Sequence, residues 1–150
     1  MPKKRDTLTF FQAFINEMID VGGANLPKSI SVSLGAKLGK ILRERGVTGI
    51  ENSLMRIYNA LKAKIVIDIN TDNSYDIYLK YSKKFCPIGG KLNPERANIV
   101  QETICIPYTT SILNTIHPNL RFHPYFKECI LDSNEKICHY HLKTEEKRND

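Results

Sequence analysis

The chain has 150 residues, of which 41% are hydrophobic and 25% are charged, and its formal net charge at pH 7 is +6. This length fits one domain that buries roughly two-thirds of the surface of its unfolded chain, so residues 1–150 are expected to form a single domain. No apolar stretch approaches the roughly 20 residues of a membrane-spanning helix and no signal peptide is recognisable, which predicts a cytoplasmic protein without a membrane span.

The first predicted helix covers residues 7–21, where apolar side chains recur every three or four positions. Phe10 and Phe11 are adjacent and broaden its apolar face. A broad apolar face on a terminal helix favours self-association, and we expect a twofold homodimer, which is the commonest closed symmetry. Gly22 is expected to end the helix.

The second predicted helix covers residues 28–45 and contains two glycines four residues apart, Gly35 and Gly39. An interior glycine costs up to about 1 kcal/mol relative to alanine, so a close approach by another backbone or by a ligand is expected there. Packing against a neighbouring helix is the favoured interpretation. Basic residues on the opposite face indicate a solvated surface rather than a nucleic-acid site, and nucleic acid is not an expected partner.

A third helix is predicted from about residue 50, with Thr48 and Glu51 spaced as a capping box. The apolar period then changes from helical to two across residues 65–70 and 75–81, which predicts a β-hairpin. The order of these elements, helices followed by a hairpin, is repeated in the second half of the chain.

That second half begins with a helix predicted over residues 93–103. Pro107 predicts a kink or break near Ile106, and a second helical piece is expected to continue to Ile116. A second hairpin is predicted over residues 121–143, followed by a frayed tail at 144–150. The predicted fold class is therefore α+β, with an antiparallel sheet of two hairpins covered by helices.

Four cysteines are the most informative candidates for chemistry. Cys86 lies in a predicted loop, Cys105 near the kinked helix, and Cys129 and Cys138 on the two arms of the second hairpin. Hairpin arms lie about 4.8 Å apart, so two facing cysteines can reach one ion. Zinc takes four tetrahedral ligands, commonly thiolates. Buried free cysteines are the competing interpretation. His139 alternates with Cys138 and should face the other side of the sheet.

The C-terminal third carries a family resemblance. Cys105-Ile106-Pro107-Tyr108, Glu128-Cys129-Ile130 and Cys138-His139-Tyr140-His141-Leu142 resemble the ending of the 4-vinyl-reductase domain family, whose members are often called hydrocarbon-binding proteins. The chain is similar to free-standing archaeal members. The resemblance implies a small-molecule-binding domain, with a fold similar to that of TRAPP-type tethering subunits.

The resemblance also implies a zinc site. In sensory members of the family the ion is held by a helix cysteine, by two hairpin cysteines and by a glutamate that lies three residues before the first hairpin cysteine. Cys105, Cys129 and Cys138 match, but Phe126 occupies the glutamate position and cannot bind metal. Cys86 is the expected replacement in a closed structural site. His123 and Glu128 remain alternatives for this fourth ligand.

The sequence therefore predicts a binding module that holds a small hydrophobic ligand, hydrocarbon-like or aromatic, in an interior apolar pocket beside a structural zinc ion. No catalytic residue is assigned. The alternatives are a reductase acting on a vinyl or related group in tetrapyrrole-type metabolism, and a protein-interaction adaptor. The candidate pocket residues are Phe11, Phe14, Leu34, Leu38, Tyr108, Ile112 and Phe126.

Overall fold

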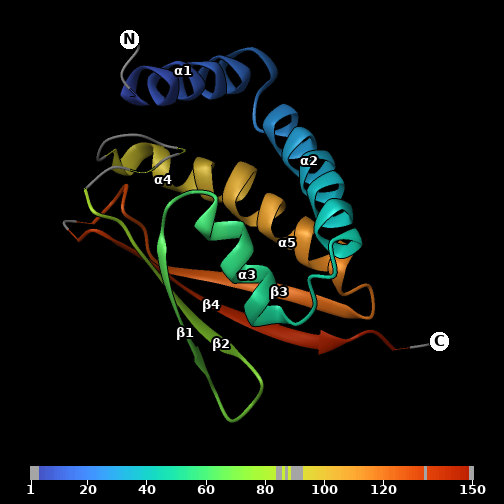
Figure 1. Cartoon of the computed structure of the whole chain (residues 1–150). Coiled ribbons are helices and arrows are strands. Elements are labelled where there is room, and N and C mark those ends of the chain that lie inside the picture. Colours follow the sequence, from blue (N-terminus) through green and yellow to red (C-terminus); the bar gives the residue numbers. More distant parts are fainter. Residues whose placement is uncertain (1–3, 84–85, 87, 89–92, 134, 149–150) are drawn as a thin grey trace.

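A four-stranded antiparallel sheet is covered on one face by helices (Figure 1). The computed structural model describes residues 4–83, 86, 88, 93–133 and 135–148. Its elements are α1 (Lys4–Gly22), α2 (Asn25–Glu44), α3 (Ile50–Asn59), β1 (Lys64–Ile69), β2 (Tyr75–Lys80), α4 (Pro94–Val100), the π-helical turn η1 (Gln101–Cys105), α5 (Ile106–Ile116), β3 (Leu120–Glu128) and β4 (Ile137–Glu146).

The strand order β1-β2-β4-β3 places the two hairpins side by side, with β2 pairing β4. This confirms the predicted α+β class and the sheet of two hairpins. Ile77 lies opposite Tyr140, and Leu79 lies opposite Cys138. These four side chains are buried, because alternate residues of each strand face the helices.

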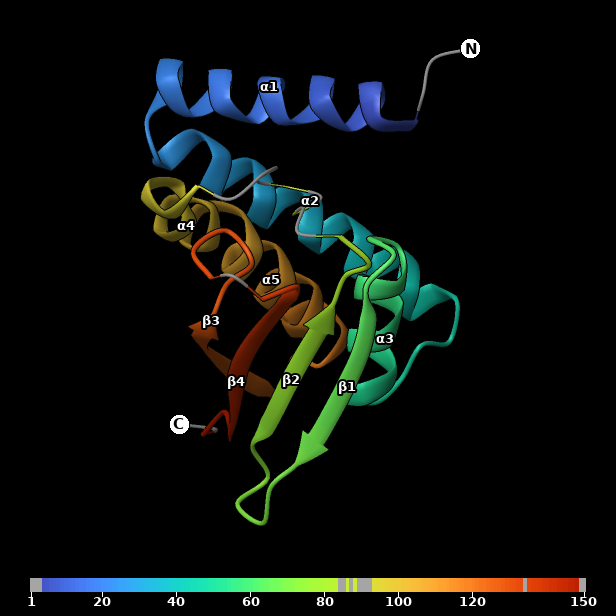
Figure 2. The same ribbon diagram turned by 90° about the vertical axis from the view of Figure 1, so that its left-hand side faces the viewer.

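The helices are stacked outward from this face of the sheet. Helices α3 and α5 rest on the strands, α2 packs along α5, and α1 lies farthest from the sheet (Figures 1 and 2). No helix in the described part of the chain is long and apolar enough to cross a membrane. The outermost helix, α1, packs against α2 (Figure 2).

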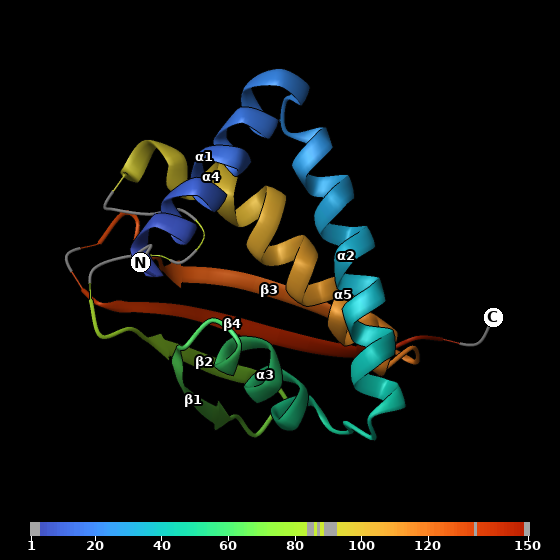
Figure 3. The same cartoon turned by 45° about the horizontal axis from the view of Figure 1, so that its top comes forward.

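The two glycines of α2 explain its close packing on α5, which Figure 3 shows from another side. A Cβ atom at Gly35 would lie 2.7 Å from the carbonyl oxygen of Tyr108, and one at Gly39 would lie 2.7 Å from the Cβ of Thr115. Ser111 Oγ also donates a hydrogen bond of 2.6 Å to the Val32 carbonyl. The predicted helix–helix contact is confirmed.

Three local predictions need correction. Gly49, with a φ of 81°, is the residue before α3, so Thr48 is one position too early to cap the helix. The helix is not broken near Ile106: η1 changes the winding just before it and leaves Pro107 in the first turn of α5, where its missing N–H is tolerated. The predicted frayed tail begins too early, since β4 continues to Glu146 opposite Leu120.

Candidate functional site

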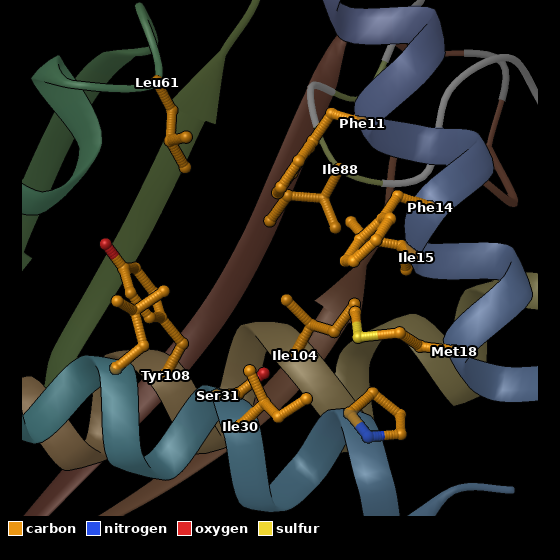
Figure 4. Close-up of a pocket in the computed structure, with 12 residues that line it drawn as sticks. Phe11, Phe14, Ile15, Met18, Ile30, Ser31, Leu61, Ile88, Ile104 and Tyr108 are labelled. Carbon is orange, nitrogen blue, oxygen red and sulfur yellow. The ribbon is translucent and has the colours of Figure 1, made fainter. Parts of the chain in front are cut away.

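A cavity of about 330 Å³ lies beneath α1 (Figure 4). Its walls come from α1, α2, η1, the start of α5, the turn after α3 and Ile88. No charged side chain lines it among the described residues. The lining residues are Phe11, Phe14, Ile15, Met18, Pro27, Ile30, Ser31, Leu34, Leu61, Ile88, Ile104 and Tyr108.

The cavity exists because α1 covers the body of the protein without packing closely against it. The chain reverses after α1 at Gly23, whose φ of 63° is in the left-handed region. Polar contacts then hold the helix: Gln12 Nε2 donates to the Cys86 carbonyl at 3.2 Å, and Arg96 lies 3.6 Å from Asp20. Of the α1 side chains described, only Ile15 and Ile19 are buried.

The structure brings together four of the seven predicted pocket residues, Phe11, Phe14, Leu34 and Tyr108. The others do not line this cavity. Ile112 and Leu38 lie one turn farther along their helices, where α2 and α5 are in contact at Gly39 and leave no space. Phe126 lies on β3 below α5, and its ring stacks on that of Tyr140 at 5.2 Å between centroids.

Sequence reasoning missed several lining residues. Ile15 and Met18 follow Phe11 by four and seven positions, so the helical period of α1 places them on the same face and could have identified them. Leu61 and Ile104 come from segments far apart in sequence. Nothing in their local pattern indicates that they share a cavity.

The four cysteines line a second, smaller cavity of about 30 Å³ beneath η1 and α5, together with Tyr58, Tyr81 and Phe126. The Cys129 and Cys138 thiols interact with each other, and this interaction lowers the pKa of Cys129 and raises that of Cys138. Cys138 in turn accepts a bond of 3.3 Å from the Ile130 amide. All four predicted metal ligands therefore line one interior space.

In this structure the cysteine side chains are not arranged as a zinc site. Thiolates are suitable ligands, but no three His, Cys, Asp or Glu residues in the described part of the chain are placed so that they could hold a metal ion. Burial also raises the pKa of the Cys105 thiol. The zinc site stays a prediction. Neither of the alternative fourth ligands, His123 and Glu128, lines the cysteine cavity; both are exposed.

Buried tyrosine hydroxyls beside the cysteines form a chain of hydrogen bonds that the sequence did not indicate. Tyr140 donates to Tyr58 at 3.0 Å, and Tyr58 hydrogen-bonds Thr109 Oγ1 at 3.0 Å. Burial raises the pKa of Tyr58. These three hydroxyls therefore satisfy one another's hydrogen-bonding needs in the core.

The uncovered face of the sheet has a polar cluster centred on Asp76. Its carboxylate lies 2.9 Å from Nε2 of His139 and 3.3 Å from Nδ1 of His141, and it accepts a bond of 2.9 Å from Asn70. The bond from Asn70, followed by that from His139, lowers the pKa of Asp76. His139 therefore faces away from the cysteines, as its alternation with Cys138 predicts.

Comparison with known proteins supports the fold. No family model matches the sequence, and no curated protein matches it. A crystal structure of trafficking protein particle complex subunit 3 from Naegleria fowleri, covalently bound to palmitic acid, superposes with a TM-score of 0.56 at 11% identity over 96% of each chain. The chain has a TRAPP-type fold. The expected relation to TRAPP-type subunits is thus supported at the level of fold, whereas the 4-vinyl-reductase resemblance gains no support from a family match.

Proposed function

We propose that this chain is a binding module that holds an extended apolar ligand, such as an acyl chain, in the cavity beneath α1. The observation that carries the proposal is the cavity itself, which measures about 330 Å³ and is lined by apolar side chains apart from Ser31 and the Tyr108 hydroxyl. Mostly apolar pockets of roughly 300–1,000 Å³ with few polar groups are typical of small-molecule sites.

Exposed apolar surface in the cavity gives the ligand its binding energy. Phe11 and Phe14 are 50% and 57% exposed although they face the cavity. An apolar ligand that covers them removes this surface from water, which is worth about 25 cal/mol per Å². Its own chain contributes about 0.8 kcal/mol for each methylene buried.

The palmitic acid in the Naegleria fowleri structure is a ligand of this class. There the attachment is covalent, but we propose a non-covalent ligand here. Among the described residues no cysteine lines the larger cavity. Cys105 directly follows the lining residue Ile104, and burial raises the pKa of its thiol. A protonated thiol is a weak nucleophile.

Calorimetric titration with decanoate, below its micellar concentration, tests the proposal. Phe14→Asp should abolish binding, because it places a carboxylate in an apolar lining. Phe10→Asp is the matched control: it is on the same helix, is 73% exposed and does not line the cavity, so binding should be unchanged. A folded wild-type protein that releases no heat with decanoate and shows no rise in Tm contradicts the proposal.

A protein-interaction adaptor is the second candidate, and exposed apolar residues on the outer helices favour it. Phe10 and Val21 on α1 are 73% and 75% exposed, and Val32 on α2 is also exposed. Exposed apolar surface of this kind marks protein interfaces. The fold neighbour is named as a subunit of a complex. We propose a second copy of this chain as the partner, forming a twofold dimer.

Light scattering separates the two functions. The wild-type protein should have twice the mass of one chain, and Phe10→Asp should yield a monomer that still binds decanoate. A wild-type monomer at high concentration contradicts the dimer and leaves ligand binding to its own test. No observation on the described residues favours the reductase alternative.

We also propose that the four cysteines bind a structural zinc ion. Its support is the shared cavity of Cys86, Cys105, Cys129 and Cys138. Binding would require the thiols to lose their protons and to move closer together around the ion.

A further inference from the structure

The two cavities are separated by a common wall. Leu61, Ile88 and Tyr108 line both the apolar cavity beneath α1 and the cysteine cavity below it. Figure 4 places Leu61 and Tyr108 at one end of the apolar cavity, with Met18 toward the other. A linear ligand that extends toward the wall therefore meets Tyr108 and Leu61.

We propose that this wall is a length stop, and that it makes the site selective for acyl chains of about ten to twelve carbons. This inference rests on the proposed ligand-binding function. A methylene group takes about the volume of a water molecule in the liquid, roughly 30 Å³. The cavity of about 330 Å³ therefore holds on the order of ten methylenes. The cysteine cavity of about 30 Å³ holds about one more, and only if the wall opens.

The wall is held in place from both sides. The Tyr108 carbonyl lies against α2 at Gly35, where even a Cβ atom would come within 2.7 Å. Leu61 sits in a tight turn in which its amide donates to the Tyr58 carbonyl at 3.0 Å, and the next residue, Lys62, has a φ of 59°. Close-packed interiors yield little to a pressing ligand. A chain that is too long must therefore leave its extra carbons in solvent.

The orientation of the ligand follows from the lining. Burial of a carboxylate against Leu61, Ile88 and the Tyr108 ring would be costly without partners, and no basic side chain lines the cavity among the described residues. The methyl end therefore points at the wall. The carboxylate lies at the other end of the ligand, away from the wall.

Titration calorimetry with saturated fatty acids of six to sixteen carbons, each below its micellar concentration, tests the length stop. Each buried methylene contributes about 0.8 kcal/mol, which corresponds to an affinity gain of roughly fourfold per carbon. Kd should fall by this factor up to ten to twelve carbons and then level off. Tyr108→Ala should move this break to longer chains by roughly three carbons, since it removes the ring and joins the two cavities.

Tyr108→Phe is the matched control, because it keeps the ring, and its break should stay at the wild-type length. If Tyr108→Ala does not fold, Leu61→Ala removes the other side of the wall and should move the break in the same direction. Affinity that keeps rising through sixteen carbons, or a break that neither folded variant moves, overturns the length stop while leaving ligand binding intact. Absence of binding at every chain length overturns both proposals.

Discussion

Replacement of Gly35 by alanine is the sharpest test of how α2 is positioned beside the cavity. Alanine favours the helix by up to about 1 kcal/mol in an exposed position. At Gly35 its Cβ would lie 2.7 Å from the Tyr108 carbonyl oxygen and 2.8 Å from the Cβ of Ser111. One obstacle is backbone, and the other belongs to a side chain fixed by its bond to the Val32 carbonyl.

Ordinary contact begins near 3.4 Å, so the helices must separate locally by several tenths of an ångström. Overpacking of this kind costs typically 1–3 kcal/mol. After the gain in helix propensity, we expect Gly35→Ala to destabilise the protein by about 1–2 kcal/mol. For a chain of this size that corresponds to a fall in Tm of roughly 2–8 °C.

Differential scanning calorimetry measures this fall, with Ser33→Ala as the control in the same helix. Ser33 is exposed, so its replacement should raise Tm slightly or leave it unchanged. A Gly35→Ala protein as stable as the wild type would refute the close contact between α2 and α5. It would also remove the rigid support assigned to Tyr108.

Three further predictions follow from other parts of the molecule. Tyr58→Phe leaves buried partners at Thr109 and Tyr140 without a hydrogen bond and should cost about 1–3 kcal/mol in urea unfolding, whereas Tyr78→Phe on the uncovered face should cost less than about 0.5 kcal/mol. Because the folded-state pKa of Asp76 is lowered, its carboxylate contributes its full stabilisation above the unfolded value near 4, and this contribution is lost progressively as the pH falls from there through the folded-state pKa. Asp76→Asn should therefore reduce Tm at pH 7 by more than at pH 3. Elemental analysis of the wild-type protein should find one zinc ion per chain, and Cys138→Ser should lower both the zinc content and Tm. A wild-type protein without stoichiometric metal would show that the cysteines are ordinary core residues.

The fold was largely accessible from the sequence because its signals are local. The switch from helical period to alternation after residue 61 predicts β1 and β2, and the same alternation places Cys138 inward and His139 outward. The errors arose where a distant partner decides the structure. The charged residues after Lys143 predict a frayed tail, yet Thr144 lies in β4 opposite Phe122 of β3, and no pattern within the tail itself indicates this pairing.

The prediction that the four cysteines lie together rests partly on hairpin geometry and partly on the family resemblance. Cys129 directly follows β3 rather than lying in it as predicted, but Glu128, the last residue of β3, pairs with His139, so the hairpin still brings Cys129 close to Cys138. The approach of Cys105 from η1 was suggested by the family resemblance, whereas no position of the family matches Cys86. Both approaches depend on how the helices lie on the sheet, which the spacing of the cysteines does not determine. The thiol–thiol hydrogen bond of Cys129 and Cys138 is a detail at the level of side chains, beyond the reach of either argument.

The composition of α1, and not only the spacing of its apolar residues, indicates the apolar cavity. Helix α1 contains more large apolar side chains than packing against one neighbour requires: Ile15 and Ile19 are buried, whereas Phe10, Phe11, Phe14 and Val21 are at least half exposed. Large apolar residues on an outer helix cost solubility and gain nothing in the folded monomer unless something covers them. Such an excess predicts a ligand or a partner for the helix. The turn at Gly23 decides which face of α1 is directed at the rest of the protein. As a result Phe11 and Phe14 lie over the cavity, where a ligand can cover them, whereas Phe10 does not line it and is left for a partner.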